Sequence, residues 1–251
     1  MKLTENTIFI TGGGTGIGRG LAEALHKLGN KVIISGRRKE HLDATTKANP
    51  GMDSVEMDIS NPANITAVTT KLIADYPALN VLINNAGIML IDDAGGKIED
   101  QLLTSTVTTN LLGPIRLTSA LIEHLKKQPK ATVIYNTSAL AFVPLALTAV
   151  YSSTKAALHS YVLSQRYKLK ATSVTVLEIA PPWVQTDLLN SSDNPRAMPL
   201  KEFIEETIKV LGTDAEEILV EQAKPLRNNP GPNERALVTQ FNDMMIATAP
   251  Q

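Results

Sequence analysis

The sequence predicts an α/β fold, namely a doubly wound parallel sheet of six strands, or seven, with helices on both faces. Three observations lead to this prediction. Short β-branched runs alternate with longer helical segments along most of the 251 residues. The strand segments are apolar throughout, as expected of strands that are buried on both faces. The connections are long enough for helical crossovers between parallel strands.

Each element follows from this alternation. The predicted strands cover residues 7–11, 31–35, 54–58, 80–84, 131–138 and 173–179. The predicted helices cover about 16–28, 39–48, 62–75, 99–126, 149–170 and 234–247, with further amphipathic helices over 199–224. No internal repeat or linker interrupts the chain, so we expect a single domain over 1–251. About 187–228 would form a substrate lid and helical region.

Composition narrows the function classes. The 24 lysines and arginines balance 25 aspartates and glutamates, so no general affinity for nucleic acid or anionic membranes is expected. The absence of cysteine excludes disulfides and thiolate chemistry. The N-terminal segment lacks the apolar region of a signal peptide, and the longest apolar tract, 139–150, is too short to span a bilayer. These features predict a cytoplasmic protein.

A glycine-rich turn follows the first predicted strand. The segment "TGGGTGIG" (11–18) places Gly12, Gly16 and Gly18 between a strand and a helix. Glycine permits the tight turn and lets the backbone approach a pyrophosphate, which the N–H groups of the helix then bind. The alternative is a plain glycine turn. The position in the first βα unit favours a dinucleotide site of the Rossmann type.

The end of the second strand bears on which dinucleotide would bind. An acidic residue there would bind the 2′-hydroxyl of NAD, but this chain has Gly36 followed by Arg37 and Arg38. A guanidinium can clamp a 2′-phosphate, so NADP(H) is favoured, while NAD(H) stays open. Asp58 ends the third strand and would either accept from the adenine amino group or cap the next helix, although Ser60 and Asn61 are better placed as caps.

Tyr151 and Lys155 lie four residues apart in "AVYSSTKAAL" (149–158). In a helix this spacing puts both side chains on one face. The pair is either a solvated lysine beside an interface tyrosine or a proton donor whose pKa the lysine controls, and the helix alone does not decide between them.

Taken together with the glycine turn, several further segments resemble the short-chain dehydrogenase/reductase family, in its single-domain branch. They are "NNAG" (84–87), Asn110, Ser138, the pair Tyr151 and Lys155, and "PPWVQTDL" (181–188). The resemblance covers about residues 5–190, and the general sequence style also looks like DltE-type bacterial oxidoreductases. It implies a catalytic tetrad of Asn110, Ser138, Tyr151 and Lys155, with a homodimer or homotetramer as the assembly.

The resemblance also implies cofactor contacts. The residues concerned are Gly12, Gly16, Ile17 and Gly18 for the pyrophosphate, Arg37 and Arg38 for the 2′-phosphate, Asp58 and Ile59 for the adenine, Asn85, Ala86 and Gly87 for the adenosine and its ribose, and Tyr151, Lys155, Pro181, Val184 and Thr186 around the nicotinamide. Two departures stand out. Pro182 replaces the family's usual glycine, and the C-terminus lacks the usual seventh-strand ending.

The tetrad would support an NAD(P)(H)-dependent reduction of ketones or oxidation of secondary alcohols. Tyr151 would act as general acid and Ser138 would hold the carbonyl. Lowering the pKa of tyrosine from about 10 to about 7 requires roughly 4 kcal/mol. A lysine cation about 4 Å away supplies roughly that amount before desolvation is subtracted. The alternatives are a non-catalytic NADP(H) sensor and a cell-envelope accessory protein.

No metal site is predicted. The four histidines, His26, His41, His124 and His159, show no ligand spacing in the sequence. The acidic pair Asp92 and Asp93 is interpreted as part of an exposed loop.

The segments around the predicted reacting centre, 138–151 and 181–189, contain one acid, Asp187, and no lysine or arginine. The side chains that flank the tetrad in sequence are Ala139, Leu140, Phe142, Leu145, Trp183, Leu188 and Leu189. They predict an apolar pocket and an uncharged small carbonyl or alcohol substrate. The alternative is that Arg196, Lys201 or Arg227 folds over the pocket and supplies a cation.

Overall fold

A seven-stranded parallel sheet forms the centre of the molecule. The structure is a computed structural model that describes residues 1–229 and 231–247. Its strands are β1 (Thr7–Thr11), β2 (Lys31–Gly36), β3 (Asp53–Glu56), β4 (Leu79–Asn84), β5 (Ala131–Asn136), β6 (Val174–Ile179) and β7 (Glu217–Ile218). They lie in the order β3-β2-β1-β4-β5-β6-β7. The strand order therefore reverses between β1 and β4, and doubly wound sheets bind their ligands at the strand ends beside such a switch point.

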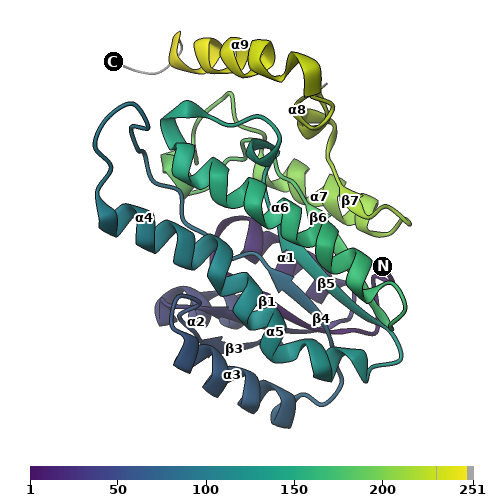
Figure 1. Ribbon diagram of the computed structural model, residues 1–251. Helices are drawn as coiled ribbons and strands as arrows, with labels where there is room; N and C mark the ends of the chain where they lie inside the picture. The colour runs from purple at the N-terminus through teal and green to yellow at the C-terminus, as the bar shows by residue number, and fades with distance from the viewer. Residues whose placement is uncertain (230, 248–251) are drawn as a thin grey trace.

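Helices cover both faces of the sheet (Figure 1). Their bounds are α1 (Gly16–Lys27), α2 (Lys39–Ala48), α3 (Pro62–Asp75), α4 (Asp100–Val107), α5 (Gly113–Lys126), α6 (Ala149–Leu169), α7 (Leu200–Leu211), α8 (Lys224–Arg227) and α9 (Glu234–Ala247). One apolar core joins the sheet to α1, α2 and α7, and a second joins its other face to α3, α5 and α6. The predicted fold class is confirmed.

The helix boundaries follow local chemistry. Asn61 precedes α3, and its side-chain oxygen accepts from the N–H groups of Ala63 at 3.0 Å and Asn64 at 3.1 Å. Pro62 takes the first helical position, where a missing N–H costs nothing. Asn61, one of the two residues expected to be better caps than Asp58, therefore caps α3. Asp58 does not cap this helix and stays a candidate for the adenine contact.

The predicted helix over 99–126 differs in its middle. A π-helical turn, Thr108–Leu112, separates α4 from α5. Pro114 has no N–H to donate to the carbonyl of Asn110, four residues earlier, so the regular hydrogen-bond ladder cannot continue there. Gly113 lies so close to Ile59 that a Cβ atom would meet its carbonyl oxygen at 2.8 Å. The turn thus places Asn110 at a break in the helix.

The C-terminal third departs most from the prediction. Residues 199–224 hold α7 but then form β7, which pairs with Glu178 and Ile179 of β6. A two-residue strand has no periodicity to detect in sequence, so helix was expected there. Helix α9 matches its predicted bounds and lies at the edge of the molecule (Figure 1). Within the described residues, none of the helices combines the length and apolar character needed to cross a membrane.

Candidate active site

The glycine turn after β1 is shaped by close backbone approach. Gly12 and Gly16 have φ angles of +67° and +53°, a region that other residues rarely adopt. A Cβ atom added at Gly18 would lie 2.2 Å from the Gly12 carbonyl oxygen and 2.3 Å from Nδ2 of Asn85. The three predicted glycines are therefore each required by the geometry of this turn.

The start of α1 is suited to an anion. No side chain caps it at Thr15, and its first turn carries no acidic residue. Its N–H groups are thus available to a phosphate, with the helix dipole favouring negative charge. Ile17 is partly buried and packs against the core below the turn. The residues present fit the pyrophosphate of a dinucleotide.

The expected adenosine end lies at the ends of β2 and β3. A hollow there is lined by Arg37, Glu56, Met57, Asp58 and Asn64. Oδ1 of Asp58 accepts from the N–H of Ser60 at 2.9 Å and from its hydroxyl at 2.7 Å. Partial burial acts to raise the pKa of Asp58, but the Ser60 hydrogen bonds and the Arg37 charge lower it, so that the net shift is downward.

The other residues predicted at this end are placed differently. Arg38 is exposed and directly precedes α2. The Ile59 side chain is buried in the core against α5 rather than lining the hollow. Glu56, which the sequence did not single out, brings a second carboxylate beside Arg37.

A chain of hydrogen bonds links the glycine turn to Lys155. The Thr11 hydroxyl accepts from the N–H groups of Asn85 and Ala86, both at 3.0 Å. Nδ2 of Asn85 donates to the Thr11 carbonyl at 2.9 Å, and its Oδ1 accepts from Asn136 at 2.8 Å. Nζ of Lys155 then donates to the Asn136 carbonyl at 2.8 Å. These bonds hold the ends of β1, β4 and β5 in one arrangement around the predicted site.

Gly87 brings the "NNAG" segment beside the predicted tetrad. A Cβ atom there would lie 3.3 Å from Oδ1 of Asn110 and 3.7 Å from Nζ of Lys155. Asn110 is fully buried in the π-helical turn and bonds Ile88 twice, accepting from its N–H at 2.9 Å and donating to its carbonyl at 2.8 Å. Its amide group therefore fixes the chain after β4 in position next to Lys155.

Tyr151 and Ser138 face each other in a buried setting. Ser138 follows β5, and its hydroxyl oxygen accepts from the N–H of Leu140 at 3.1 Å. Burial raises the pKa of Tyr151 to about 12, and a hydrogen bond with Ser138 opposes this shift. Lys155 is one helical turn further along α6, with Nζ 5.5 Å from the centre of the Tyr151 ring. The four predicted side chains thus gather at one place.

The electrostatics differ from the expectation that Lys155 lowers the pKa of Tyr151 to about 7. Burial lowers the pKa of Lys155 to about 8, with the Glu178 carboxylate opposing the shift, and burial dominates for Tyr151 as well. Both groups lose water, and desolvation disfavours the charged form of each. In this state Tyr151 is a protonated phenol at neutral pH, as a proton donor must be.

The segment after β6 closes the site from the side of α1. The Pro181 carbonyl accepts from the N–H of Ala139 at 2.8 Å, which ties the segment to the Ser138 loop. Val184 is buried and forms an isolated parallel bridge with Met198. A Cβ atom at Gly16 would lie 3.4 Å from a methyl carbon of Thr186. Val184 and Thr186 therefore lie between the glycine turn and the predicted lid.

The interpretation of Asp92 and Asp93 as an exposed loop was wrong for Asp92. Its side chain is only 8% exposed, and Oδ2 accepts from the N–H of Val150 at 2.9 Å at the start of α6. Asp93 is exposed, as expected. Asp92 thus satisfies the first turn of the helix that carries Tyr151 and Lys155. The hydrogen bond joins residues 58 positions apart in the chain, so no local sequence pattern could have revealed this role of Asp92.

The side chains predicted to form the apolar pocket divide into two groups. Ala139 and Leu145 are buried in the core, whereas Leu140, Phe142, Trp183 and Leu189 are partly exposed, and Leu188 is more so. Of the cations left open, Arg227 binds Glu217 through two hydrogen bonds of 2.7 and 2.8 Å. Arg196 lies over the Trp183 ring at 5.5 Å. Arg227 also lies over the Phe142 ring at 4.7 Å, so two of the three cations reach side chains of the predicted pocket.

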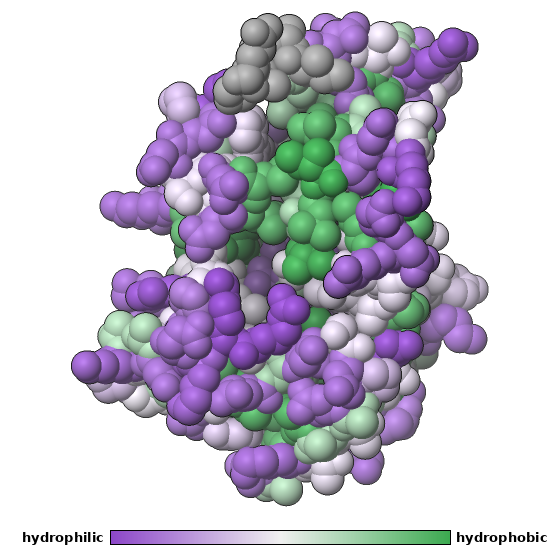
Figure 2. All heavy atoms as spheres, turned by 90° about the vertical axis from the view of Figure 1, so that its left-hand side faces the viewer, coloured by the Kyte–Doolittle hydropathy of each residue, from purple (hydrophilic) through white to green (hydrophobic). Residues whose placement is uncertain are grey.

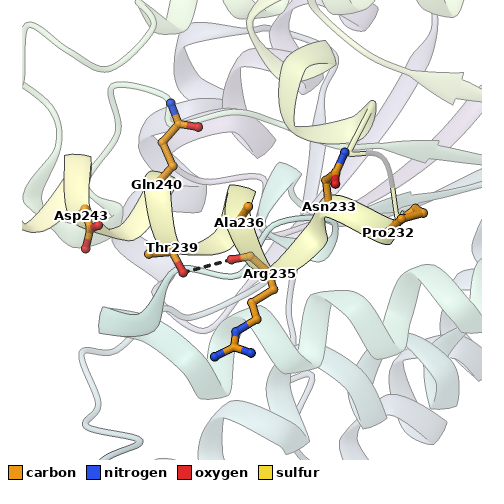
Figure 3. A pocket seen from close by; sticks show the side chains of 7 residues that line it. All are labelled: Pro232, Asn233, Arg235, Ala236, Thr239, Gln240 and Asp243. Carbon is orange, nitrogen blue, oxygen red and sulfur yellow. Dashed lines mark hydrogen bonds between the residues drawn. The ribbon is translucent and has the colours of Figure 1, made fainter.

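The structure also gathers side chains that the sequence did not connect. Ligand atoms of His159, Glu178 and Glu217 lie within 4.8 Å of one another. We assign no metal to them, because Glu217 holds Arg227 and Glu178 holds Thr137 and His159. A further hollow (Figure 3) is lined by residues of α9 and the turn before it, including Arg235, Gln240 and Asp243. It contains none of the predicted site residues and is the exposed flank of a single helix.

Comparison with known proteins agrees with this geometry. The sequence model of the short chain dehydrogenase family matches residues 6–197. The uncharacterized oxidoreductase DltE of Bacillus subtilis is 38% identical over 248 residues, which cover 96% of this chain and 98% of that protein. An uncharacterized oxidoreductase of Staphylococcus epidermidis is 28% identical, covering 76% of this chain and 84% of its own length.

Solved structures share the fold. A short chain dehydrogenase from Burkholderia cenocepacia in complex with NADP superposes with a TM-score of 0.84 at 24% identity, covering 96% of this chain and 98% of that one. A short chain dehydrogenase/reductase from Burkholderia phymatum in complex with NAD gives 0.83 at 17% identity, covering 94% and 96%. Because the family model matches residues 6–197 and a relative is 38% identical over 96% of the chain, the chain belongs to the short-chain dehydrogenase/reductase family of oxidoreductases.

Proposed function

We propose that this protein is an NAD(P)(H)-dependent oxidoreductase that reduces ketones or oxidises secondary alcohols, with Tyr151 as general acid and base. The observation that carries the proposal is the meeting of Ser138, Tyr151 and Lys155 at the strand ends next to the glycine turn. Lys155 is linked to that turn through Asn136 and Asn85. A buried lysine and tyrosine at such a place suit proton transfer better than they suit packing.

The chain's own residues supply the proton chemistry. The bound nicotinamide supplies or accepts the hydride. In reduction, the Tyr151 hydroxyl gives its proton to the substrate oxygen, and Ser138 donates a hydrogen bond to that oxygen. The raised pKa of Tyr151 keeps this proton in place at neutral pH. Lys155 stabilises the phenolate that remains, and Asn110 holds the adjoining chain at Ile88.

Replacing Tyr151 with phenylalanine tests the proposal. Tyr151→Phe keeps the ring but removes the transferred proton, so ketone reduction should fall at least 100-fold while cofactor affinity stays nearly unchanged. The assay follows NAD(P)H oxidation with a panel of carbonyl compounds, and Tyr167→Phe, which alters an exposed tyrosine on the same helix, is the matched control. A Tyr151→Phe enzyme that keeps a tenth of the rate would exclude Tyr151 as the acid. Cofactor binding without any turnover would favour a sensor.

We further propose that NADP(H) is preferred over NAD(H). Relatives of the same fold bind NADP or NAD, so the choice rests on this chain's own residues. Arg37 lines the hollow at the end of β2 and would pair with a 2′-phosphate, whereas Glu56 and Asp58 on the same hollow would repel it. Arg37→Ala should raise the Michaelis constant for NADPH about tenfold and that for NADH much less. Equal increases in the two Michaelis constants would show that Arg37 does not determine the cofactor preference.

We also propose an uncharged, largely apolar substrate. Figure 2 shows a hollow in one face, with hydrophobic residues gathered above it and hydrophilic residues below. Ile91 and Leu147 are exposed apolar side chains on two segments of the surface, and the N–H of Asp92 joins these segments by donating to the Leu147 carbonyl at 3.0 Å. Burying such a substrate gains about 25 cal/mol per Å². An aryl ketone should therefore have a higher kcat/KM than a keto acid of similar size, and the reverse result would point to Arg196 or Arg227.

The assembly and location stay predictions. Leu163 and Tyr167 are exposed on α6, Tyr167 by 68%, and apolar surface of this kind favours a second copy of the chain. A mass near that of one 27.0 kDa chain in light scattering at micromolar concentration would contradict a homodimer or homotetramer. Cell fractionation tests the predicted cytoplasmic location.

A further inference from the structure

A carboxylate lies buried behind the proposed site. Glu178 interrupts the apolar run of β6 and has no exposed surface. Its Oε1 accepts from the Thr137 hydroxyl at 2.6 Å, and its Oε2 lies 2.8 Å from Nδ1 of His159. Placing a carboxylate here costs several kcal/mol unless it is paired, and an apolar residue would fill the same place in the core at no such cost. Packing of the core alone therefore does not account for a carboxylate at this position.

The two partners of this carboxylate belong to the segments that carry the proposed chemistry. Thr137 lies between Asn136, whose carbonyl accepts from Lys155 at 2.8 Å, and Ser138. His159 is on α6, one turn after Lys155, and therefore on the same side of the helix. The carboxylate is thus held between the end of β5 and the helix face that presents the lysine.

The electrostatic effect acts on Lys155. Burial lowers the pKa of Lys155 to about 8, and the charge of Glu178 opposes that shift. Tyr151, by contrast, is affected chiefly by burial and by Ser138. The Glu178 charge therefore acts on the pKa of Lys155 rather than on that of Tyr151.

Other charged groups surround Glu178 and are engaged elsewhere. Arg227 of α8 binds Glu217 of β7 through two hydrogen bonds, and the Glu178 charge also helps to raise the pKa of Arg227. Arg166 of α6 donates to the Val176 carbonyl at 3.0 Å and lies 3.3 Å from Glu216. In β5, the neighbouring strand, Tyr135 is in register with Glu178, and its hydroxyl donates to Gln165 at 2.8 Å.

We propose that Glu178, held by Thr137 and His159, is a positioning residue that keeps Lys155 protonated. The proposal rests on the proposed function, because the charge of Lys155 matters only where Tyr151 transfers a proton. It extends that function to a residue on β6 that touches neither the expected substrate nor the cofactor. The carboxylate offsets part of the cost of burying an ammonium, so that the lysine remains a cation at the pH of catalysis.

A titration of Lys155 tests this without any turnover. Protein labelled with ¹³C at lysine Cε is followed by NMR between pH 6 and 11, and the Lys155 signal is identified by its loss in Lys155→Met. Glu178→Gln keeps the size and polar contacts but removes the charge, so the Lys155 midpoint should fall by about one pH unit. Glu216→Gln is the matched control, since its carboxylate is 59% exposed and paired with Arg166, and should leave the midpoint unchanged.

Turnover gives the second measurement. Ketone reduction requires Tyr151 and Lys155 both protonated, so its rate falls on the alkaline side when the pair loses its first proton. Removing a nearby negative charge makes that loss easier whichever group releases the proton. The alkaline limb should therefore move to lower pH in Glu178→Gln, by about the same amount as the NMR midpoint. A merely structural role would lower the rate at every pH and leave the limb in place.

Each outcome bears on one of the two proposals. An unchanged Lys155 midpoint in folded Glu178→Gln overturns the role of Glu178, even if Tyr151→Phe is inactive as expected. A lowered midpoint in a protein that reduces no carbonyl compound supports the role of Glu178 and removes the proposed function. If Glu178→Gln does not fold, Glu178→Met, which fills the core without a polar group, carries the same expected shift.

Discussion

The glycine turn after β1 and helix α9 are held in place in opposite ways. At the turn, the packing is so close that a single carbon added at Gly18 would lie 2.2 Å from the Gly12 carbonyl oxygen and 2.3 Å from the side-chain Nδ2 of Asn85. Helix α9 lies at the edge of the molecule (Figure 1) and is joined to it through Asn242, which accepts from the N–H of Ala146 and donates to the Pro144 carbonyl at 3.0 Å. Close packing thus fixes the turn, whereas side-chain hydrogen bonds hold α9 against the loop before α6.

The largest effect is expected at the turn. Gly18→Ala should lower the free energy of unfolding by several kcal/mol and weaken cofactor binding more than 100-fold, because the Gly12 backbone has to shift. Gly231→Ala in the C-terminal region is the matched control, since its Cβ would meet nothing within 4 Å, and should change stability by less than about 0.5 kcal/mol. Urea denaturation and cofactor titration measure both variants. Similar losses in the two would contradict the contrast between the regions.

A second prediction concerns the buried cation next to the turn. The unfolded chain holds the Lys155 proton up to about its ordinary pKa of 10.5, whereas the folded protein releases it near 8. Between these values the unfolded state binds more protons, so raising the pH stabilises the folded state. Relative to Lys155→Met, the wild type should gain on the order of 3 kcal/mol from pH 8 to 10.5.

The hydrogen bond lost from the Asn136 carbonyl in Lys155→Met adds a constant offset, which cancels when the difference is followed against pH. Urea denaturation of both proteins at a series of pH values gives this difference. A difference that stays flat across the range would show that burial does not perturb Lys155. The gain would show that the cofactor-binding region carries a group whose burial costs stability at neutral pH.

The smallest effect on global stability is expected at α9. Asn242→Ala removes the side chain that joins α9 to the loop before α6, so backbone amides of α9 should exchange faster with solvent. The free energy of unfolding should change by less than about 1 kcal/mol, and the KM for a ketone should rise several-fold with that for NADPH unchanged. Asn233→Ala, at an exposed position just before the same helix (Figure 3), is the control. A rise in the KM for NADPH instead would show that α9 affects cofactor binding.

Much of the cofactor-binding region was predictable because its rules are local. The glycines between a strand and a helix indicated the turn, Asn61 before a helix indicated a cap, and the spacing of Tyr151 and Lys155 placed them on one helix face. Each of these depends on residues within about one turn of each other, where backbone geometry leaves few choices.

Other features were decided only by tertiary packing. The seventh strand, two residues long, exists because β6 offers it an edge, and Asp92 caps a helix that begins 57 residues after it. The pKa of Tyr151 was expected to fall through Lys155, but burial is the largest influence on both groups and raises the pKa of Tyr151 instead. Desolvation depends on how much of the whole chain surrounds a group, which spacing along the sequence does not express.

The sequence by itself thus determined the chemistry available to this protein: a dinucleotide turn and a serine, tyrosine and lysine at strand and helix positions that meet. Tertiary structure decided the charges that act on them. Glu178 and His159 are 19 residues apart and show no shared pattern, yet β6 and α6 bring them to 2.8 Å behind Lys155. Identity and spacing are written in the chain, whereas the dielectric and the partners of a buried charge arise only when distant segments pack together.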